Sequence, residues 1–370
     1  MNIAIQASDL DHPRIDGTRV YILNLLKNFG KLDPTSDFLI YHKNNFNPEL
    51  APPEFSNYKI IQKPFPFFWT QTRFAIELWK DQPDVLWMPM QALPITRRKG
   101  LKTVVTIHDL AFKIFPNHFP KNDLRKLNWL TDYAVRNSDK IIAVSQSTKK
   151  DILKFYPEIK AEKIRVIYHG FDAELFQKDY SKEEVQEVLM KYQLKAKDYI
   201  LYIGALQPRK NLEILIKAFE AVKKTGFPDL KLVLAGEKAW MWEETEKLVS
   251  ESPYNKDIVM TGKLPFNDLG RLLSGAGAFT LPSLYEGFGI PILEAFASKI
   301  PVVCAKNSSL PEVGGEAALY FQNQTELEEN LTKILTDEKL RQSLIERGNE
   351  QIKKFSWEKC SQETLDFLKS

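Results

Sequence analysis

The chain has 370 residues, more than the about 250 to 300 at which one hydrophobic core stops growing, so two domains are expected. Its 51 Lys and Arg residues nearly balance 48 Asp and Glu residues, and the net charge of +3 does not favour nucleic acid as a partner. The cysteines, Cys304 and Cys360, are too few for a disulfide framework and lack zinc-ligand spacing. A reducing compartment fits this composition.

The apolar runs bear on localisation. Asp9 and Asp11 interrupt the first apolar segment before it reaches the length of a signal-peptide core. No run approaches the ~18 apolar residues of a membrane-spanning helix. We therefore expect a soluble, cytoplasmic protein, with the inner face of the membrane as a further location if segment 64–80 contacts lipid.

Short β-rich runs alternate with longer segments of helical period, which is typical of parallel sheets covered by helices. In the first half the predicted strands are Asn2–Ala7, Phe38–Tyr41, Val85–Met88, Thr103–Ile107, Lys140–Val144 and Ile164–Ile167. In the second half they are Tyr199–Ile203, Lys231–Ala235, Ile258–Thr261, Ala278–Pro282 and Ile300–Cys304. The charged stretch Phe171–Asp198 separates the halves. The sequence thus predicts an α/β protein with two Rossmann-like domains, spanning 1–175 and 176–356.

Two positions in the first half follow predicted strands. Gly17, after Asp16, opens a helix with apolar residues on one face, although an ordinary strand-to-helix loop has the same appearance. His108 comes directly after Thr103–Ile107, where it can donate to a sugar hydroxyl or sense a phosphate. A histidine that only satisfies loop backbone is the alternative.

Segment 64–80, PFPFFWTQTRFAIELWK, is rich in aromatic residues, among them Phe67, Phe68, Trp69, Phe74 and Trp79, and it contains the cations Arg73 and Lys80. Such a segment can lie on a membrane surface or meet a lipid-linked acceptor. A helix that packs on the core, with its cations reaching solvent, is the other interpretation.

A basic pair, Arg209 and Lys210, lies between the strand that ends near Gly204 and the helix that begins near Leu212. Open α/β sheets bind ligands at this edge, above the carboxyl ends of the strands. Cations at a helix start oppose the helix dipole, so a bound anion such as a diphosphate leaving group would explain them. A solvated basic pair is the alternative.

The run LPSLYEGFGIPILEA reads as a strand, a glycine loop and a helix. Gly287 and Gly289 let the backbone approach a ligand, and a helix start with Pro291 in its first turn suits a pyrophosphate. Glu286 precedes the glycines and Glu294 is placed in the first helical turn. Their carboxylates can accept from vicinal hydroxyls, of a hexose at Glu286 and a ribose at Glu294. A glutamate that caps its own helix is the alternative.

These motifs resemble those of the retaining glycosyltransferases of the GT-B fold, family four. The resemblance covers nearly the whole chain through GTRVYILNLL, VVTIHDL, IIAVSQSTKKD, GALQPRKNLEILIKAF, LPSLYEGFGIPILEAFA and FSWEKCSQETLDFL. It implies a cleft between the two domains and a last helix, 357–370, that crosses back onto the first. One position departs from the pattern: Ala205 stands where many relatives carry an arginine, which leaves Arg209 to supply the charge.

The resemblance also implies roles for individual residues. Catalysis is assigned to His108, Arg209, Lys210 and Glu286. Donor binding is assigned to Gly17, Arg209, Lys210, Glu286, Gly287, Phe288, Gly289 and Glu294. No cofactor or metal is expected, because side chains provide the positive charge.

The expected function is transfer of a hexose, from a donor such as GDP-mannose or UDP-glucose, to a glycan, lipid-linked or small-molecule acceptor. Two other functions remain open. One is a nucleotide-sugar epimerase or hydrolase on the same scaffold. The other is a non-catalytic nucleotide-sugar binding partner of another transferase.

Overall fold

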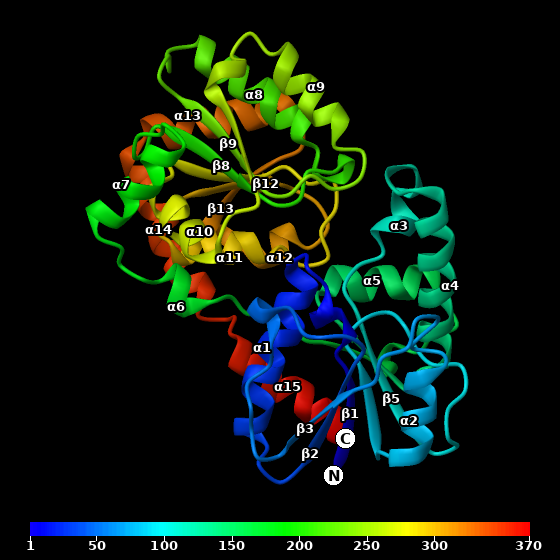
Figure 1. Cartoon of the computed structure of the whole chain (residues 1–370). Helices are drawn as coiled ribbons and strands as arrows, with labels where there is room; N and C mark the ends of the chain where they lie inside the picture. The colour runs from blue at the N-terminus through cyan, green and yellow to red at the C-terminus, as the bar shows by residue number, and fades with distance from the viewer. The chain divides into compact units, whose positions relative to one another are not determined.

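The computed structural model describes residues 1–370, which form two compact units (Figure 1). The first unit comprises Met1–Ile114, Lys121–Gly170 and Ser356–Ser370, and the second comprises Phe115–Pro120 and Phe171–Phe355. None of the helices combines the length and the apolar character needed to cross a lipid bilayer.

The first unit is built on a parallel sheet of seven strands in the order β3-β2-β1-β4-β5-β6-β7. The strands are β1 (Asn2–Gln6), β2 (Asp37–His42), β3 (Tyr58–Gln62), β4 (Val85–Met88), β5 (Lys102–Ile107), β6 (Lys140–Ala143) and β7 (Ile164–Val166). The chain runs from β1 outward to β3 and then returns to β4 on the other side of β1. The topological switch point therefore lies at the neighbouring strands β1 and β4, and such sheets bind ligands beyond the carboxyl ends of the strands at this point.

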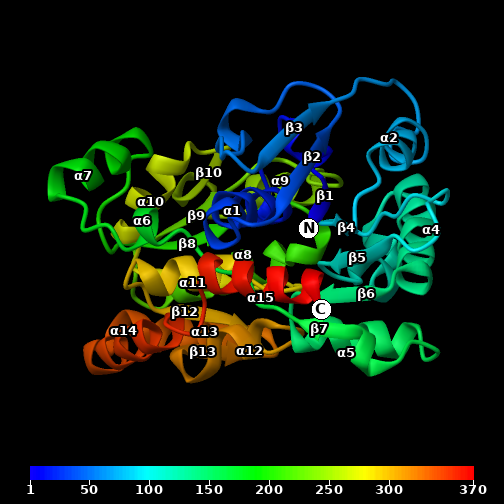
Figure 2. The same ribbon diagram turned by 90° about the horizontal axis from the view of Figure 1, so that it is seen from below.

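Helices cover the first sheet: α1 (Gly17–Leu32), α2 (Arg73–Asp81), α3 (Ala111–Ile114), α4 (Lys121–Asn137), α5 (Gln146–Phe155) and α15 (Trp357–Lys369). The Asp16 side chain caps α1 by accepting from the Arg19 backbone N–H at 3.2 Å. Helix α15 packs beside α1, as Figures 1 and 2 show in red and blue. Lys140 Nζ donates to the Phe367 carbonyl at 2.9 Å, a favourable place for a cation at a helix C-terminus.

The second unit holds a parallel sheet of six strands in the order β10-β9-β8-β11-β12-β13. The strands are β8 (Tyr199–Ile203), β9 (Lys231–Ala235), β10 (Ile258–Gly262), β11 (Ala278–Leu281), β12 (Val302–Ala305) and β13 (Ala318–Phe321). Its helices are α6 (Ala173–Phe176), α7 (Lys182–Lys191), α8 (Leu212–Lys224), α9 (Glu243–Glu251), α10 (Phe266–Gly275), α11 (Ile290–Ala297), α12 (Leu310–Gly314), α13 (Gln324–Thr336) and α14 (Glu338–Ile352). Here the switch point lies between β8 and β11.

The observed units differ from the predicted domains at two places. The first unit ends its main span at Gly170 instead of 175, because α6 already belongs to the second unit, where Ser298 Oγ donates to the Phe176 carbonyl at 3.2 Å. The loop Phe115–Pro120 also belongs to the second unit, where Trp240 Nε1 donates to the His118 carbonyl at 2.7 Å.

Candidate active site

Three of the predicted site residues meet at the switch point of the second sheet. Arg209 and Lys210 lie in a short 3-10 turn after β8, and Glu286 lies in the loop after β11. Strands β8 and β11 are parallel neighbours, so their carboxyl ends bring together side chains that are 76 positions apart in the sequence. This edge of the sheet is where open α/β folds place their ligands.

The Glu286 carboxylate is the centre of the cluster. Lys210 Nζ is 2.5 Å from its Oε1, and Arg209 Nη1 is 3.1 Å from its Oε2. Ser283 Oγ donates to Oε1 at 2.6 Å. Arg209 Nη1 also donates to the Tyr285 carbonyl at 2.8 Å, which ties the arginine to the loop. The three charged side chains are 11% to 15% exposed, so water screens their attraction only weakly.

The charges in this cluster decide its protonation state. Burial alone would raise the pKa of Glu286, but the positive charges of Lys210 and Arg209, with hydrogen bonds from Lys210 and Ser283, lower it to about 2. The carboxylate is therefore ionised at neutral pH, and the three side chains together carry one net positive charge. An anion that joined them would find an electrostatically favourable site.

This geometry corrects two expectations about the basic pair. Arg209 and Lys210 are not a solvated pair, because both contact a buried carboxylate. Two cations near the start of a helix oppose the helix dipole, but this does not require a bound anion, since Glu286 itself supplies the negative charge. The pair also precedes α8, from which Asn211, with a left-handed φ of 52°, separates it.

A polar segment that sequence reasoning missed supports the loop. The Glu286 backbone N–H donates to Ser308 Oγ at 3.0 Å. Ser309 Oγ contacts the carbonyls of Glu286 and Phe288 at 2.9 and 2.7 Å, and Asn307 Nδ2 donates to the Ser283 carbonyl at 3.1 Å. Asn307–Ser309 begins two residues after the end of the buried strand β12, and this position in the loop that follows a strand was the available signal.

Gly289 fixes the start of α11. It precedes the helix with a φ of 106°, and a Cβ there would meet Leu310 Cδ2 at 3.0 Å. Both facts favour glycine. Pro291 stands in the first turn, as predicted, and no side chain caps the helix. Glu286 is therefore not a helix cap, which removes that alternative for its role.

Glu294 differs from Glu286 in its surroundings. It lies in the second turn of α11, not the first as expected, and its side chain makes no hydrogen bond with the protein. Although part of its surface remains exposed, burial of the carboxyl, with a smaller contribution from the charge of Asp172, raises its pKa to about 8. An unpaired carboxyl of this kind can gain hydrogen bonds from a ligand that brings hydroxyl groups.

His108 and Gly17 belong to the first unit. His108 Nε2 is 2.8 Å from the Pro89 carbonyl and must donate to it, and burial lowers the pKa of the imidazole. The neutral ring has only this one N–H, so Nδ1 is an acceptor. In this geometry the imidazole would accept a hydrogen bond from a sugar hydroxyl through Nδ1 instead of donating one, and the place of His108 in the site stays a prediction. Gly17 is exposed at the start of α1.

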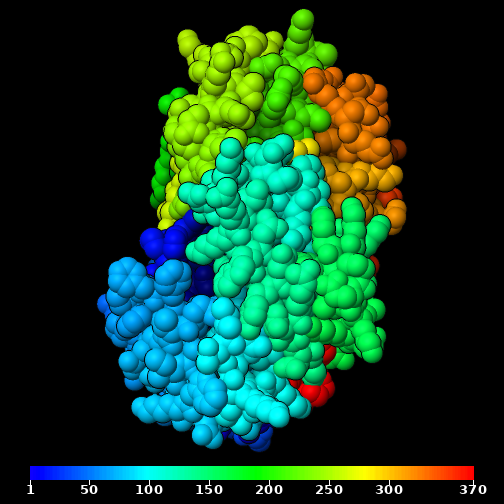
Figure 3. Space-filling view, turned by 90° about the vertical axis from the view of Figure 1, so that its right-hand side faces the viewer, coloured from blue at the N-terminus to red at the C-terminus, as the bar shows by residue number.

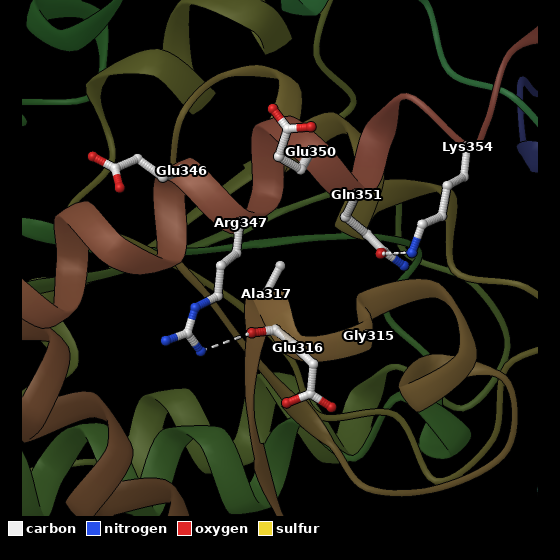
Figure 4. A pocket seen from close by; sticks show the side chains of 8 residues that line it. All are labelled: Gly315, Glu316, Ala317, Glu346, Arg347, Glu350, Gln351 and Lys354. Carbon is white, nitrogen blue, oxygen red and sulfur yellow. Dashed lines mark hydrogen bonds between the residues drawn. The ribbon is translucent and has the colours of Figure 1, made fainter.

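A pocket of about 570 Å³ lies elsewhere in the second unit, between α14 and the turn Gly315–Ala317 (Figure 4). Arg347 Nη1 donates to the Glu316 carbonyl at 3.3 Å, and Lys354 Nζ donates to Gln351 Oε1 at 2.7 Å. None of the predicted site residues lines this pocket.

Comparison with known proteins decides the family. Residues 15–175 match the family described as Glycosyltransferase Family 4, and residues 185–351 match Glycosyl transferases group 1. The chain is 32% identical to O-antigen chain mannosyltransferase B of Escherichia coli over 270 aligned residues. The aligned region covers 72% of this chain and 70% of the relative. The chain belongs to the family 4 glycosyltransferases.

Two further comparisons bear on this glycosyltransferase. The serotype-specific mannosyltransferase WbdA of Escherichia coli is 30% identical over 265 residues, which are 69% of this chain but 32% of that longer relative. The structure of Anabaena HepE in complex with UDP-glucose matches with a TM-score of 0.77 and 17% identity over 100% of this chain and 99% of that one. At this identity the match shows the fold, two parallel-sheet units of the GT-B type.

Replacing Glu286 with glutamine tests the charge cluster. The pKa of Glu286 is lowered from 4.5 to about 2, so its stabilisation is present above pH 4.5 and is lost as the pH falls towards 2. We expect Glu286→Gln to lower the free energy of unfolding by about 3 kcal/mol at pH 7, and the difference from wild type to shrink below pH 4.5. Urea unfolding across this pH range measures both effects.

The matched control is Glu213→Gln, which removes an exposed carboxylate paired with Lys217. Its effect should stay below about 1 kcal/mol, as for other surface pairs. A loss at Glu286→Gln that is the same at pH 3 and pH 7 would contradict the assignment.

Proposed function

We propose that this glycosyltransferase transfers mannose from GDP-mannose to a glycan acceptor in polysaccharide synthesis, with retention of anomeric configuration. The observation that carries the proposal is the buried cluster of Arg209, Lys210 and Glu286 at the switch point of the second sheet. The choice of mannose is supported by the two Escherichia coli mannosyltransferases that the chain resembles. UDP-glucose, which the HepE structure contains, is the second donor to test.

Cleavage of the sugar–phosphate bond leaves negative charge on a diphosphate, and fixed positive charge stabilises it. Lys210 and Arg209 each carry several N–H donors, so each can hold Glu286 and a phosphate oxygen together. Because Glu286 and its loop already fix both cations, little reorganisation is needed when the charge develops. This proposal needs no metal ion.

The low pKa of Glu286 bears on its role. A carboxylate with a pKa of about 2 is a weak general base at neutral pH, so proton abstraction from the acceptor is not its task. It is suited to accept hydrogen bonds from the hydroxyls of the transferred sugar. In the proposed reaction the acceptor attacks from the leaving-group face and a donor phosphate oxygen takes its proton. Glu294 would accept from the ribose hydroxyls.

The direct test is a panel of nucleotide sugars, with and without mono- and oligosaccharide acceptors, in buffer that contains EDTA. We expect acceptor-dependent release of GDP from GDP-mannose and an α-linked product. Epimerised donor without transfer would indicate the isomerase, and donor binding without turnover would indicate the non-catalytic partner. Activity that disappears in EDTA and returns with magnesium would contradict the metal-free mechanism.

Lys210→Ala removes one of the two cations proposed to face the diphosphate. We expect turnover to fall about 100-fold, because a preorganised charge is lost where charge develops. Steady-state assays of GDP release measure the effect, and thermal unfolding checks that the variant is folded. Lys217→Ala, which breaks an exposed pair with Glu213, is the control and should leave turnover unchanged. A Lys210→Ala enzyme within a few-fold of wild type would remove Lys210 from the mechanism.

We further propose that segment 64–80 contacts a membrane surface. The segment contains α2 only from Arg73, and its aromatic residues divide between two environments. Trp69 and Phe74 are buried and stacked on each other, which agrees with the core interpretation. Phe67 and Phe68 are 71% and 82% exposed, and Phe68 has a left-handed φ of 45° that non-glycine residues rarely adopt.

The surroundings of the two exposed rings favour a lipid surface. Gln71 binds the neighbouring loop, donating to the Leu93 carbonyl at 3.1 Å and accepting from the Ile95 N–H at 2.8 Å. Ile95 and Trp79 are half-exposed. The loop continues into the basic run Arg97–Lys99. In Figure 3, segment 64–80 is azure, and it lies beside the cyan surface formed by residues near 100. Aromatic residues with basic neighbours suit an anionic membrane.

The double variant Phe67→Ser/Phe68→Ser tests this contact. We expect wild-type protein to float with vesicles that contain phosphatidylglycerol, and the double variant to lose most of this binding, because the exposed rings provide the apolar contact. Phe266→Ser, which changes a partly exposed phenylalanine in the second unit, should float like wild type. Equal flotation of the double variant, or none by wild type, would reject the membrane surface.

A further inference from the structure

A buried amide, that of Gln207, stands directly before the basic pair of the second unit. Gln207 is 4% exposed, and its extended backbone leads into the 3-10 turn Pro208–Lys210. Its backbone carbonyl accepts from the Lys210 N–H at 2.9 Å, which closes this turn. Buried polar side chains are nearly always hydrogen-bonded, so the amide of Gln207 needs a partner inside the protein.

The partner of this amide is the guanidinium of Arg209. The amide faces two of its nitrogens, Nε at 3.1 Å and Nη2 at 3.3 Å. A guanidinium carries donors only, so the amide atom that faces it is the oxygen, which accepts from both. Hydrogen bonds to a charged donor are stronger than neutral ones, and two of them to one planar group restrict its rotation.

A second part of the same guanidinium is held by the loop after β11. Arg209 Nη1 donates to the Tyr285 carbonyl at 2.8 Å and to Glu286 Oε2 at 3.1 Å. The backbone follows, because the Leu284 N–H donates to the Arg209 carbonyl at 2.9 Å. Gln207 differs from Glu286 in being neutral. It therefore orients the arginine without removing the net positive charge of the cluster.

Gln207 is itself attached to a fixed part of the sheet. Beyond the end of β8, the Leu206 N–H donates to the Glu237 carbonyl at 2.9 Å, and the Ala239 N–H donates to the Leu206 carbonyl at 3.1 Å. These bonds continue the parallel pairing of β8 with β9 past the strand ends. The oxygen that holds Arg209 thus comes from a segment with little freedom to move.

We propose that Gln207 is a positioning residue of the donor site, whose amide oxygen holds Arg209 in the orientation that receives the diphosphate. The inference rests on the proposed function, in which Arg209 and Lys210 stabilise the leaving group. Gln207 acts through Arg209 and not by touching the nucleotide. Its contribution is preorganisation, because a cation that is already fixed needs no rearrangement when negative charge develops beside it.

The test compares wild type with Gln207→Leu and Gln207→Met, two variants of similar volume that lack the amide oxygen. Calorimetric titration with GDP and GMP, and with UDP and UMP, measures the preference for the diphosphate. We expect this preference to fall about tenfold in both variants while the affinity for the monophosphate stays unchanged, as for the loss of a hydrogen bond that orients one phosphate-binding cation.

The matched control is Gln351→Leu in the same unit. Gln351 is another buried glutamine that accepts from a cation, Lys354 Nζ at 2.7 Å, beside the pocket away from the charge cluster (Figure 4). This variant should melt at a lower temperature and keep the wild-type preference for the diphosphate. A general loss of packing is in this way separated from a loss of position at Arg209.

NMR of the arginine Nε–H groups tests the contact itself. Arg209→Lys assigns the Arg209 signal by its disappearance. We expect this N–H to exchange slowly with water in wild type and in Gln207→Glu, whose carboxylate also accepts. It should exchange rapidly in Gln207→Leu and Gln207→Met.

Three results would overturn the inference: variants that keep the diphosphate preference, variants that lose affinity equally for mono- and diphosphates, or exchange at Arg209 Nε that the substitutions leave unchanged. Failure of the proposed function has a different signature. Wild type without any preference for the diphosphate would contradict that function and the positioning role with it. Slow exchange at Arg209 Nε would then still show that Gln207 holds the arginine.

Discussion

The ion cluster of Lys210, Arg209 and Glu286 is the interaction on which the second unit's site depends. Removing three charges from water is unfavourable, and their mutual attraction offsets this only when the geometry is good and the remaining hydrogen bonds are made. Ser283 completes the shell of the carboxylate, and Ser308 and Ser309 hold the backbone around it. The same contacts set the path of the loop into Gly289 and α11. The charge cluster and the loop conformation therefore depend on the same contacts.

The two sheets follow one topological rule with different chemistry. In each, the chain reverses its direction of winding beside the first strand of the unit, and polar side chains collect where the strands at that point end. The second switch point holds two cations and one carboxylate, which suits a phosphate-bearing donor. The first holds the amide of Gln6, the acceptor nitrogen of His108 and a cation, Arg19, that is paired with Asp16. The two switch points therefore carry side chains of different charge and hydrogen-bonding character.

The sequence predicted the inner strands well, because strands buried on both faces are continuous apolar runs. It missed β3 and β13, each at an edge of its sheet, and in β3 the exposed residues Lys59 and Ile60 break that pattern. The motifs identified Arg209, Lys210 and Glu286 but not their pairing, since a contact between segments 76 positions apart depends on strand order. Likewise the direction of the His108 hydrogen bond depends on Pro89, which no local pattern connects to it.

The central claim is that the Arg209–Lys210–Glu286 cluster receives the diphosphate of a nucleotide. Calorimetric titration of the wild-type protein with GDP and GMP, and with UDP and UMP, tests it most directly. If the cluster binds the second phosphate, the diphosphate of the preferred base should bind at least about tenfold more tightly than the monophosphate, with the advantage shrinking at high salt. Equal affinity for mono- and diphosphates of both bases would contradict the account.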